Sequence, residues 1–503
     1  MQQPVGYQFI IEALGLDLPP LLRPGCIERV RTVQETETDL HQAPVLYPEA
    51  MWPGDRLFDH LRFALEHEGV QPGVLKAFGN RTDLPRLILD DATQSVRPLH
   101  RRLAFMHTFL TGEIVPLAVA KGQRYIDVAN PRLQFVLDKG DLDPAYRVRN
   151  NLLGNPRFCP QVFKSARMLA ALRDDSVAGN DPWANCPPEL QERIEHYLYH
   201  HETQASWKIE REPPHARRIR EFVSLLRLAH LRDFMSETGL AELQRSITGQ
   251  RSQAGQPPWR TEQVWVGFAD REWQEVVVLL GAPPATLPRL MAGLLACHRR
   301  LRGDSNLPPV VHAACTSFPL VYIHPFSDGN GRAHRFLLHN VLAQRGYLPA
   351  DTIFPLSAWL LKNRRAYVAS MTPTCQGIVD MARMRWLPES RMEVTNDVEP
   401  FFQYMDLTGE VAALYHFVQA TVREEMEPSI DFMVHFDDAR QQLEGHVDWP
   451  YRRLSLFINL CHQNGGRLSK NKRALSEFRC LPDAQLARLE ACVQRAFGFE
   501  AGD

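Results

Sequence analysis

Residues 324–335 read His324-Pro325-Phe326-Ser327-Asp328-Gly329-Asn330-Gly331-Arg332-Ala333-His334-Arg335, and the rest of the chain is interpreted outward from them. An apolar run from Leu320 to Ile323 precedes this stretch. After it, apolar residues recur at the spacing of a helix that buries one face. The pattern predicts a tight polar turn between two core helices.

The residues of this turn suit the binding of nucleotide phosphates. Gly329 and Gly331 lack a Cβ atom, so the backbone can take a positive φ and come close to a ligand. Successive amides around Asn330, at the start of a helix, form an anion-binding site. Arg332 and Arg335 are three residues apart, so they lie on one side of that helix and reach phosphate oxygens.

Two further groups carry metal and proton chemistry. Asp328 offers a hard oxygen ligand for a Mg2+ ion that also binds phosphates. His324 has an ordinary pKa of about 6.5, which suits a general base near neutral pH. Each of these groups, taken alone, is more often structural than functional, but here they converge on one turn.

The order of residues resembles the signature of the Fic family, His-Pro-Phe-x-Asp/Glu-Gly-Asn-Gly-Arg-x-x-Arg, at every fixed position. Fic enzymes transfer AMP from ATP to a hydroxyl side chain of a target protein. The resemblance implies that His324 takes the proton of the target Tyr, Thr or Ser and that Asp328 holds Mg2+. It also implies that Arg335 grips the γ-phosphate, and that the remaining phosphate contacts come from Gly329, Asn330, Gly331 and Arg332.

A second stretch, residues 187–212, is expected to be a helix that ends in Ser206-Trp207-Lys208-Ile209-Glu210-Arg211. It resembles the Fic inhibitory motif, Ser/Thr-x-x-x-Glu-Gly/Asn, which precedes the signature in part of the family. The resemblance implies that Glu210 pairs with Arg335 and blocks the γ-phosphate position, with Ser206 as the other motif residue. Arg211 stands where Gly or Asn is usual. Its side chain either competes for the Glu210 carboxylate, which weakens the inhibition, or points to solvent. An ordinary exposed helix end is the structural alternative.

Residues 260–281 are expected to form a β-hairpin, because the first part alternates and the second part is a short apolar run. Its position resembles the Fic flap, which pairs with the target backbone and presents the hydroxyl. The docking residues are then Val264, Trp265, Val266 and Gly267. An ordinary hairpin is the alternative.

Composition places limits on the class of protein. The 503 residues are 44% hydrophobic and 23% charged with a net charge of −2, which is typical of soluble globular proteins. The 9 cysteines include no Cys-x-x-Cys pair and indicate reduced thiols in a cytoplasmic protein. We expect no signal peptide and no membrane span. His196 and His200 have metal-ligand spacing, but no third ligand is evident.

We therefore expect a mainly α protein with a Fic-type helical bundle and a hairpin flap. Residues 1–185 form a mostly helical region, 186–375 the catalytic domain, and 376–503 a helical region. In this last part, residues 440–503 carry basic residues in a pattern that a winged-helix DNA-binding module also shows, although a helical tail with a solvated basic face is favoured. The oligomeric state stays open, a homodimer included.

Three functions are compatible with the sequence. The first is a protein adenylyltransferase that uses ATP and Mg2+, acts on a target protein and is inhibited by its own Glu210. The second is a Fic enzyme that transfers another nucleotide or phosphate group, or removes AMP. The third is a non-catalytic scaffold whose C-terminal helices bind DNA or protein. The intact set of signature residues argues against the third.

Overall fold

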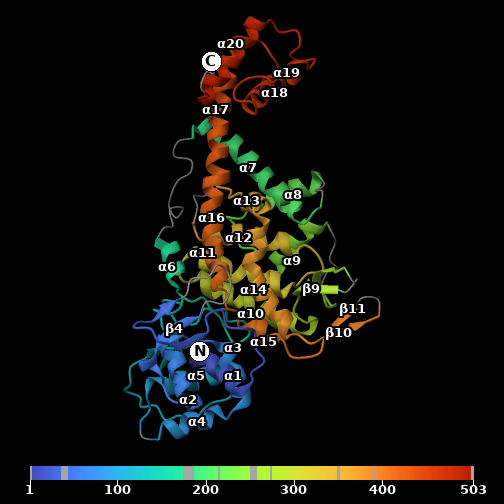
Figure 1. The fold of residues 1–503 in the computed structure, drawn as a ribbon. Coiled ribbons are helices and arrows are strands. Elements are labelled where there is room, and N and C mark those ends of the chain that lie inside the picture. Colours follow the sequence, from blue (N-terminus) through green and yellow to red (C-terminus); the bar gives the residue numbers. More distant parts are fainter. Residues whose placement is uncertain are drawn as a thin grey trace.

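The computed structural model describes residues 3–35, 44–93, 95–173, 186–212, 216–249, 258–271, 275–347, 352–388 and 391–499. Helices dominate the described chain, and its strands form small sheets of two to four strands (Figure 1). The predicted mainly α class is confirmed. Residues 249–259 are rich in Gly, Gln, Ser and Pro, which predicts a loop, and residues 250–257 lie outside the described part of the chain.

The N-terminal part has its own hydrophobic core, which contains Tyr7, Phe78 and Leu103. Asp83 caps one of its helices by accepting a hydrogen bond from the amide of Arg86, and Gly112 ends another in the left-handed conformation. The elements are β1 (Gln3–Pro4), α1 (Gly6–Leu14), β2 (Gly25–Glu28), β3 (Gln34–Glu35), β4 (Val45–Pro48), α2 (Leu57–His67), α3 (Pro72–Arg81), α4 (Leu84–Asp91), α5 (Pro98–Thr111), β5 (Ile126–Asp127), β6 (Asp141–Asp143), β7 (Val148–Asn150) and α6 (Ala166–Arg173).

The central part is a bundle built around α11 (Pro309–Ile323), whose residues from Val310 to Ile323 are all buried. A helix that is apolar all round has to be covered on every side. The helices that pack against it are α10 (Leu287–Arg302), α12 (Asn330–Gln344) and α16 (Thr408–Thr421). The elements here are α7 (Pro188–Ile209), α8 (Ala216–Arg227), α9 (Glu237–Thr248), β8 (Trp265–Ala269), β9 (Glu275–Leu280), α10 (Leu287–Arg302), α12 (Asn330–Gln344), α13 (Leu356–Lys362) and α14 (Arg364–Met381).

The C-terminal part continues from this bundle into a long helix and a small distal module. The helix runs from α16 (Thr408–Thr421) through a π turn, Val422–Met426, into α17 (Glu427–Glu444) and ends far from the N-terminal part (Figure 1). Its other elements are β10 (Met384–Leu387), β11 (Arg391–Val394), α15 (Glu399–Gln403), α18 (Tyr451–His462), α19 (Lys470–Arg473) and α20 (Asp483–Phe497). The module encloses a separate core around Phe457 and Leu489.

One core crosses the boundaries expected from the sequence. The cluster that surrounds α11 takes side chains from Phe135 in the N-terminal region through Ile430 in α17. α14 itself passes through residue 375. Side-chain packing therefore joins the expected catalytic domain to parts of both flanking regions.

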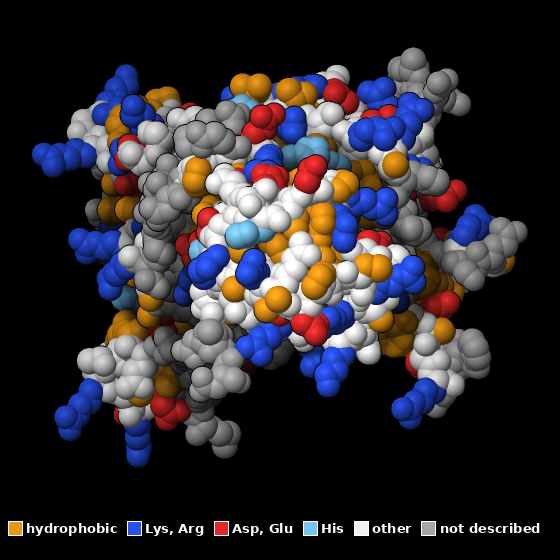
Figure 2. Space-filling model, turned by 90° about the horizontal axis from the view of Figure 1, so that it is seen from above, with side chains coloured by type: hydrophobic (Ala, Val, Ile, Leu, Met, Phe, Trp, Pro, Cys, Tyr) orange, Lys and Arg blue, Asp and Glu red, His pale blue; other side chains and the backbone are white. Residues whose placement is uncertain are grey.

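The distal module lacks a long exposed helix between α18 and α20 within the described residues, because α19 is only four residues long. Seen from this end, Lys and Arg side chains are scattered among acidic and apolar ones (Figure 2). DNA binding by residues 440–503 stays a prediction.

Three simpler expectations concern cysteines, metals and membranes. All nine cysteines are free thiols, and eight of them are buried. In the described part of the chain, no group of three or more His, Cys, Asp or Glu residues is arranged to hold a metal ion. His196 and His200 instead pack ring against ring, with centroids 4.5 Å apart. Among the described helices, none combines the length and apolar character of a membrane span.

Candidate active site

The signature forms the turn between α11 and α12. His324 ends α11 in the left-handed conformation, with φ of 52°, and Gly329 precedes α12 with φ of 91°. The Asn330 side chain closes the turn, because its Oδ1 accepts from the Phe326 amide (3.0 Å) and its Nδ2 donates to the Phe326 carbonyl (2.8 Å). Asn330 thus holds the loop in place, and the first amides of α12 are left without intrahelical partners.

The imidazole of His324 is fixed in one tautomer. Its Nδ1 lies 3.0 Å from the Val321 carbonyl oxygen, which only accepts, so Nδ1 carries the proton and Nε2 keeps a free lone pair. Burial lowers the pKa of His324, the hydrogen bond to Val321 raises it, and the charge of Arg260 lowers it further. The net lowering keeps the ring neutral, as a base requires.

Arg335 is buried and meets both residues of the expected inhibitory motif. Its Nε donates to Ser206 Oγ (3.0 Å), and its Nη2 donates to Glu210 Oε1 (2.8 Å) and to the Ser206 carbonyl (2.8 Å). Burial alone would raise the pKa of Glu210, but the charge and hydrogen bond of Arg335 outweigh it and the pKa is lowered. A negative carboxylate therefore faces Arg335 at neutral pH.

The same carboxylate sits at the start of α12, where the free amides would attract an anion. A Cβ atom on Gly331 would lie 2.4 Å from Glu210 Oε1, so only glycine leaves room for this approach. Glu210 thus occupies both the guanidinium and the helix terminus that the sequence predicted as phosphate ligands.

Arg332 contacts two carboxylates, those of Asp328 and Glu212. The sequence analysis did not single out Glu212. Its Nη1 donates to Glu212 Oε2 (2.7 Å) and its Nη2 to Asp328 Oδ1 (3.0 Å). The guanidinium carbon also lies 5.4 Å from the centre of the buried Trp207 ring. The end of α7 therefore engages both arginines of the signature, through Glu210 and Glu212.

Arg211, between these two carboxylates, has φ of 60°, which is unusual for a residue with a side chain. Gly and Asn reach this left-handed region most readily. The left-handed turn explains why Gly or Asn is usual at this position in the inhibitory motif. Here arginine adopts the same conformation, at a cost of about 1 to 2 kcal/mol.

The expected hairpin is present as β8 and β9, antiparallel, with a β-bulge between Val266 and Gly267. Val266 and Phe268 are about half exposed, at 47% and 57%. In the described residues β8 pairs with β9 alone, so its other edge is open. Val264 lies just before β8, where its carbonyl accepts from the Gly281 amide (3.1 Å). Trp265 packs edge-on against Trp386 of β10, and the hairpin that β10 forms with β11 was missed because its strands are only four residues long.

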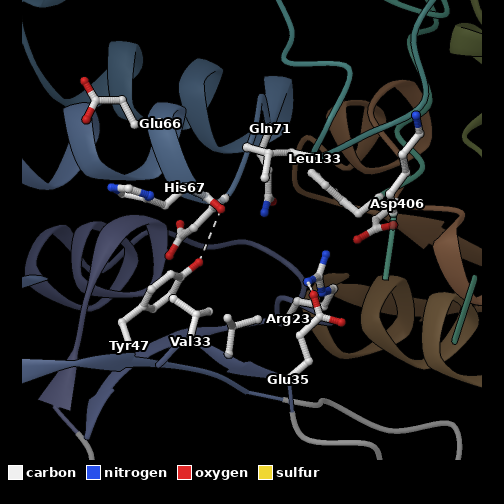
Figure 3. A pocket seen from close by; sticks show the side chains of 13 residues that line it. Arg23, Val33, Glu35, Tyr47, Glu66, His67, Gln71, Leu133 and Asp406 are labelled. Carbon is white, nitrogen blue, oxygen red and sulfur yellow. Dashed lines mark hydrogen bonds and ion pairs between the residues drawn. The ribbon is translucent and has the colours of Figure 1, made fainter. Parts of the chain in front are cut away.

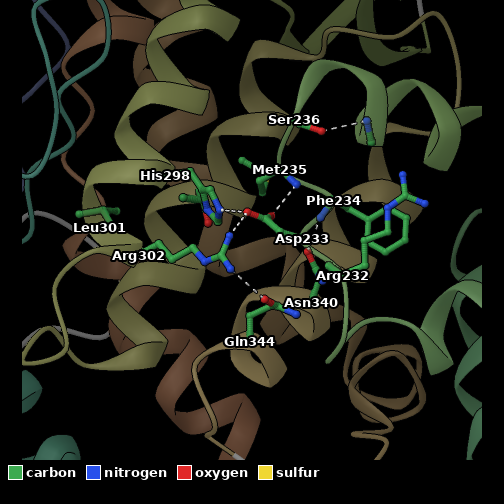
Figure 4. A network of polar contacts seen from close by, with 12 residues as sticks. Arg232, Asp233, Phe234, Met235, Ser236, His298, Leu301, Arg302, Asn340 and Gln344 are labelled. Carbon is green, nitrogen blue, oxygen red and sulfur yellow. Dashed lines mark hydrogen bonds and ion pairs between the residues drawn. The ribbon is translucent and has the colours of Figure 1, made fainter.

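A polar network holds the segment between α8 and α9 against the bundle (Figure 4). Asp233 accepts from Arg302 (2.8 Å) and lies 3.0 Å from His298 Nε2. Asn340 of α12 donates to the Ala229 and Arg232 carbonyls (both 2.7 Å). Burial would raise the pKa of Asp233, but His298 and its other partners lower it to about 2. The network positions α9, whose Ile247 lies against Gly329 of the signature.

The acidic position of the signature fits a magnesium ion that is shared with a nucleotide. The Asp328 side chain is 49% exposed, and its one Arg332 contact uses Oδ1. Mg2+ commonly binds through one or two carboxylates together with substrate phosphates and water. A single carboxylate beside a phosphate site is therefore a sufficient donor set from this chain.

A cavity of about 230 Å3 lies elsewhere, between the N-terminal part and the bundle (Figure 3). Its lining includes Arg23, Glu35, Tyr47 and Asp406, and none of residues 324–335. Most of its polar side chains have internal partners, such as the ion pair of Arg23 with Glu35 at 2.6 Å. This cavity is separate from the candidate active site.

Comparison with known proteins identifies the family of the central segment. Residues 234–342 match the Fic/DOC family. A protein named Protein adenylyltransferase Fic from Culex quinquefasciatus is 32% identical over 128 residues, which are 24% of this chain and 22% of that protein. One of the same name from Drosophila virilis is 51% identical over 46 residues, 9% of this chain and 10% of that protein. The chain thus matches less than a quarter of the length of these relatives.

A solved structure of a Fic family protein from Desulfovibrio desulfuricans G20 aligns with 67% of this chain and 85% of its own, at 17% identity and a TM-score of 0.36. For residues 234–342, this match confirms the Fic family that the signature predicted.

Proposed function

Because residues 234–342 carry a Fic domain, we propose that the protein is an adenylyltransferase that moves AMP from ATP to a Tyr, Thr or Ser hydroxyl of a target protein. The observation that carries the proposal is the fixed tautomer of His324. Its Nε2 lone pair is free at the mouth of a turn that also offers helix amides, two arginines and one carboxylate. Proton removal and phosphate binding thereby meet at one place.

The reaction balances with these groups alone. The target hydroxyl oxygen attacks the α-phosphorus, the bond from that phosphorus to the bridging oxygen breaks, and pyrophosphate leaves. The hydroxyl proton passes to His324 Nε2. Transfer of this kind depends mainly on positioning and charge stabilisation, which the amides of α12 and the guanidinium groups of Arg332 and Arg335 supply. A Mg2+ ion held by Asp328 would neutralise part of the phosphate charge.

Carboxylates engage both signature arginines in the structure. Glu210 uses the donors of Arg335 that a γ-phosphate would need, and Glu212 does the same at Arg332. We propose that both carboxylates restrain the enzyme. Both arginines are buried, and the Glu210 side chain is the less exposed of the two carboxylates, at 34% against 44% for Glu212. We therefore expect the Glu210 contact to be the stronger.

The target is proposed to dock along the open edge of β8, next to Val264, Trp265, Val266 and Gly267. An unpaired strand edge adds an extended peptide through main-chain hydrogen bonds. The base of the hairpin touches the end of α11, where the Ala282 amide donates to the Ile323 carbonyl (3.1 Å). A docked segment would therefore run past His324.

The test is incubation with α-labelled ATP and Mg2+, followed by gel analysis of the wild type, Glu210→Gly and Glu210→Gly/His324→Ala. We expect strong self-labelling by Glu210→Gly, weak basal labelling by the wild type and none by the double variant, which should still bind ATP. Asp328→Ala in the Glu210→Gly background should lose both the rate and its dependence on Mg2+.

Other outcomes change the assignment. Strong labelling of the wild type would keep the transferase and remove the inhibition. Labelling by a different nucleotide only would point to another transferred group, and release of AMP from a modified target by the wild type would point to AMP removal. Labelling that survives His324→Ala would exclude His324 as the base.

A further inference from the structure

Arg260 is a buried arginine next to the signature turn, and the sequence predicted no role for it. Its guanidinium donates to four backbone carbonyls: His324 (Nε, 2.7 Å), Ala282 (Nη2, 2.5 Å), Ile323 (Nη2, 3.4 Å) and Glu262. Its own amide donates to the Pro325 carbonyl (2.9 Å). Among the described residues, no carboxylate pairs with it.

These acceptors come from two separate walls of the site. Glu262 and Ala282 lie on the two legs of the β8–β9 hairpin, before β8 and after β9. Ile323 and His324 are the last residues of α11 and its cap, and Pro325 follows in the signature. One planar group therefore fastens both legs of the hairpin to the residue proposed as the base.

Burial of an unpaired charge is costly unless its hydrogen bonds are all satisfied. Here the cation lies at the carboxyl end of α11, where the helix dipole and free carbonyls favour positive charge. Burial lowers the pKa of Arg260 to about 10, which still leaves it charged at neutral pH. If Arg260 only stabilised the fold, an apolar residue of similar volume would do so without the cost of removing a charge from water.

We propose that Arg260 is a positioning residue that sets the register between the hairpin and His324. It holds the His324 carbonyl while this residue keeps its left-handed backbone, with φ of 52°. Its charge also disfavours a proton on the imidazole. The inference rests on the proposed function, since it assigns how the docked hydroxyl and the base are brought into line.

The experiment compares Arg260→Met and Arg260→Lys in the full-length Glu210→Gly protein. Arg345→Met is the matched control, because Arg345 is another arginine bound to carbonyls, those of Leu301, Asp304 and Leu307, at the far end of α12. The readouts are the labelling rate at saturating ATP, the KM for ATP, and the titration of His324 followed by NMR with 15N-labelled histidine.

For Arg260→Met we expect the labelling rate to fall about 100-fold, as a misplaced base does, with the KM for ATP changed by less than about threefold. The titration midpoint of His324 should move to higher pH. Arg260→Lys keeps the positive charge but loses the planar set of guanidinium donors. The titration midpoint of His324 should therefore stay close to that of the Glu210→Gly parent, while the labelling rate falls about 10-fold. Arg345→Met should lower thermal stability only.

The proposal is overturned if Arg260→Met labels like its parent, or if it loses rate while the His324 titration stays unchanged. Should Arg260→Met fail to fold by circular dichroism, Arg260→Lys decides: an unchanged rate overturns the proposal. If the Glu210→Gly parent does not label at all, the adenylyltransferase proposal fails. The NMR titration then still tests the link between Arg260 and His324.

Discussion

At the scale of single residues, Arg211 shows how one backbone angle bears on regulation. Its φ of 60° is the conformation that Gly and Asn favour, and it lies between the two carboxylates that contact the signature arginines. The inhibitory turn therefore carries a conformational cost of about 1 kcal/mol or more that glycine would not impose. The sequence alone leaves two readings of Arg211, competition for Glu210 or a solvent-directed side chain, and neither involves this angle.

We expect Arg211→Gly to reduce basal self-labelling of the otherwise wild-type protein several-fold, because the turn that holds Glu210 becomes easier to form. Quantitative labelling with α-labelled ATP measures the change. Arg211→Ala separates the two explanations, since it keeps the left-handed cost and removes the guanidinium. If Arg211→Ala lowers labelling as much as Arg211→Gly does, charge competition is the cause and the conformational account is wrong.

His324 gives a second prediction at this scale. Its pKa is lowered by burial and by Arg260, while the negative charge of Glu210 raises it. The neutral, base form is thus retained below the ordinary pKa of about 6.5, and activity should rise with pH through a midpoint below that value.

Glu210→Gly removes a negative charge that raises the pKa of His324. The acid limb of its pH–rate profile should therefore lie at lower pH than that of Glu210→Asp, which keeps a negative side chain. The pH–rate profile of labelling, taken between pH 4.5 and 8 in one mixed buffer, measures both limbs. A midpoint above 7 in Glu210→Gly would contradict the buried, neutral histidine.

At the scale of elements, the regulatory unit is the pair formed by the end of α7 and the start of α12. Two carboxylates on the turn after Ile209 face two arginines one helical turn apart. The Glu210 contact was expected from the resemblance of residues 206–211 to the inhibitory motif. The Glu212 contact could not be anticipated, since its reach to Arg332 depends on the left-handed Arg211 that follows the helix.

We predict that Glu212→Gln raises basal labelling about twofold to fivefold, the effect of losing one partly exposed ion pair. The increase should be smaller than that of Glu210→Gly, measured in the same assay. Glu221→Gln is the matched control, because it breaks the exposed Arg217–Glu221 pair on α8. Lower labelling in Glu212→Gln would mean that Glu212 supports the active form.

The limits of sequence reasoning are also clearest at this scale. The signature turn, the hairpin and the main helices follow from local spacing and apolar period, and the structure contains each of them. Arg260 was not identifiable, because all its acceptors are backbone carbonyls that carry no sequence signal. The β10–β11 hairpin and the short α19 escaped for a related reason: very short elements depend on tertiary packing more than on propensity.

At the scale of the whole molecule, the core does not stop where the expected catalytic domain ends. Glu410 of α16 is buried at 1% exposure and accepts from Tyr322 of α11 (2.6 Å) and from Thr374 of α14 (2.6 Å). A single carboxyl group thus joins the central helix α11, α14, and α16, the helix that leads to the distal module. These two hydrogen bonds hold the three helices together as one unit.

The buried Glu410 carboxyl group predicts how the stability of the fold depends on pH. Burial raises the pKa of Glu410 to about 7, although the hydroxyls of Thr374 and Tyr322 lower it. In the unfolded chain the same group ionises near 4.5. Between these values the folded protein holds a proton that the unfolded chain has released, so the stability that Glu410 contributes is full below pH 4.5 and is lost as pH rises to 7.

Glu410→Gln keeps an acceptor for both hydroxyls and cannot ionise. Relative to the wild type, its free energy of unfolding should therefore improve as pH rises from 4.5 to 7, by about 1.4 kcal/mol for each unit of pKa difference. Thermal or urea unfolding at several pH values measures this difference, with the exposed Glu237→Gln as control. Parallel curves for the wild type and Glu410→Gln would show that Glu410 is ionised in the folded protein, and the three helices would then be held together by packing without this proton.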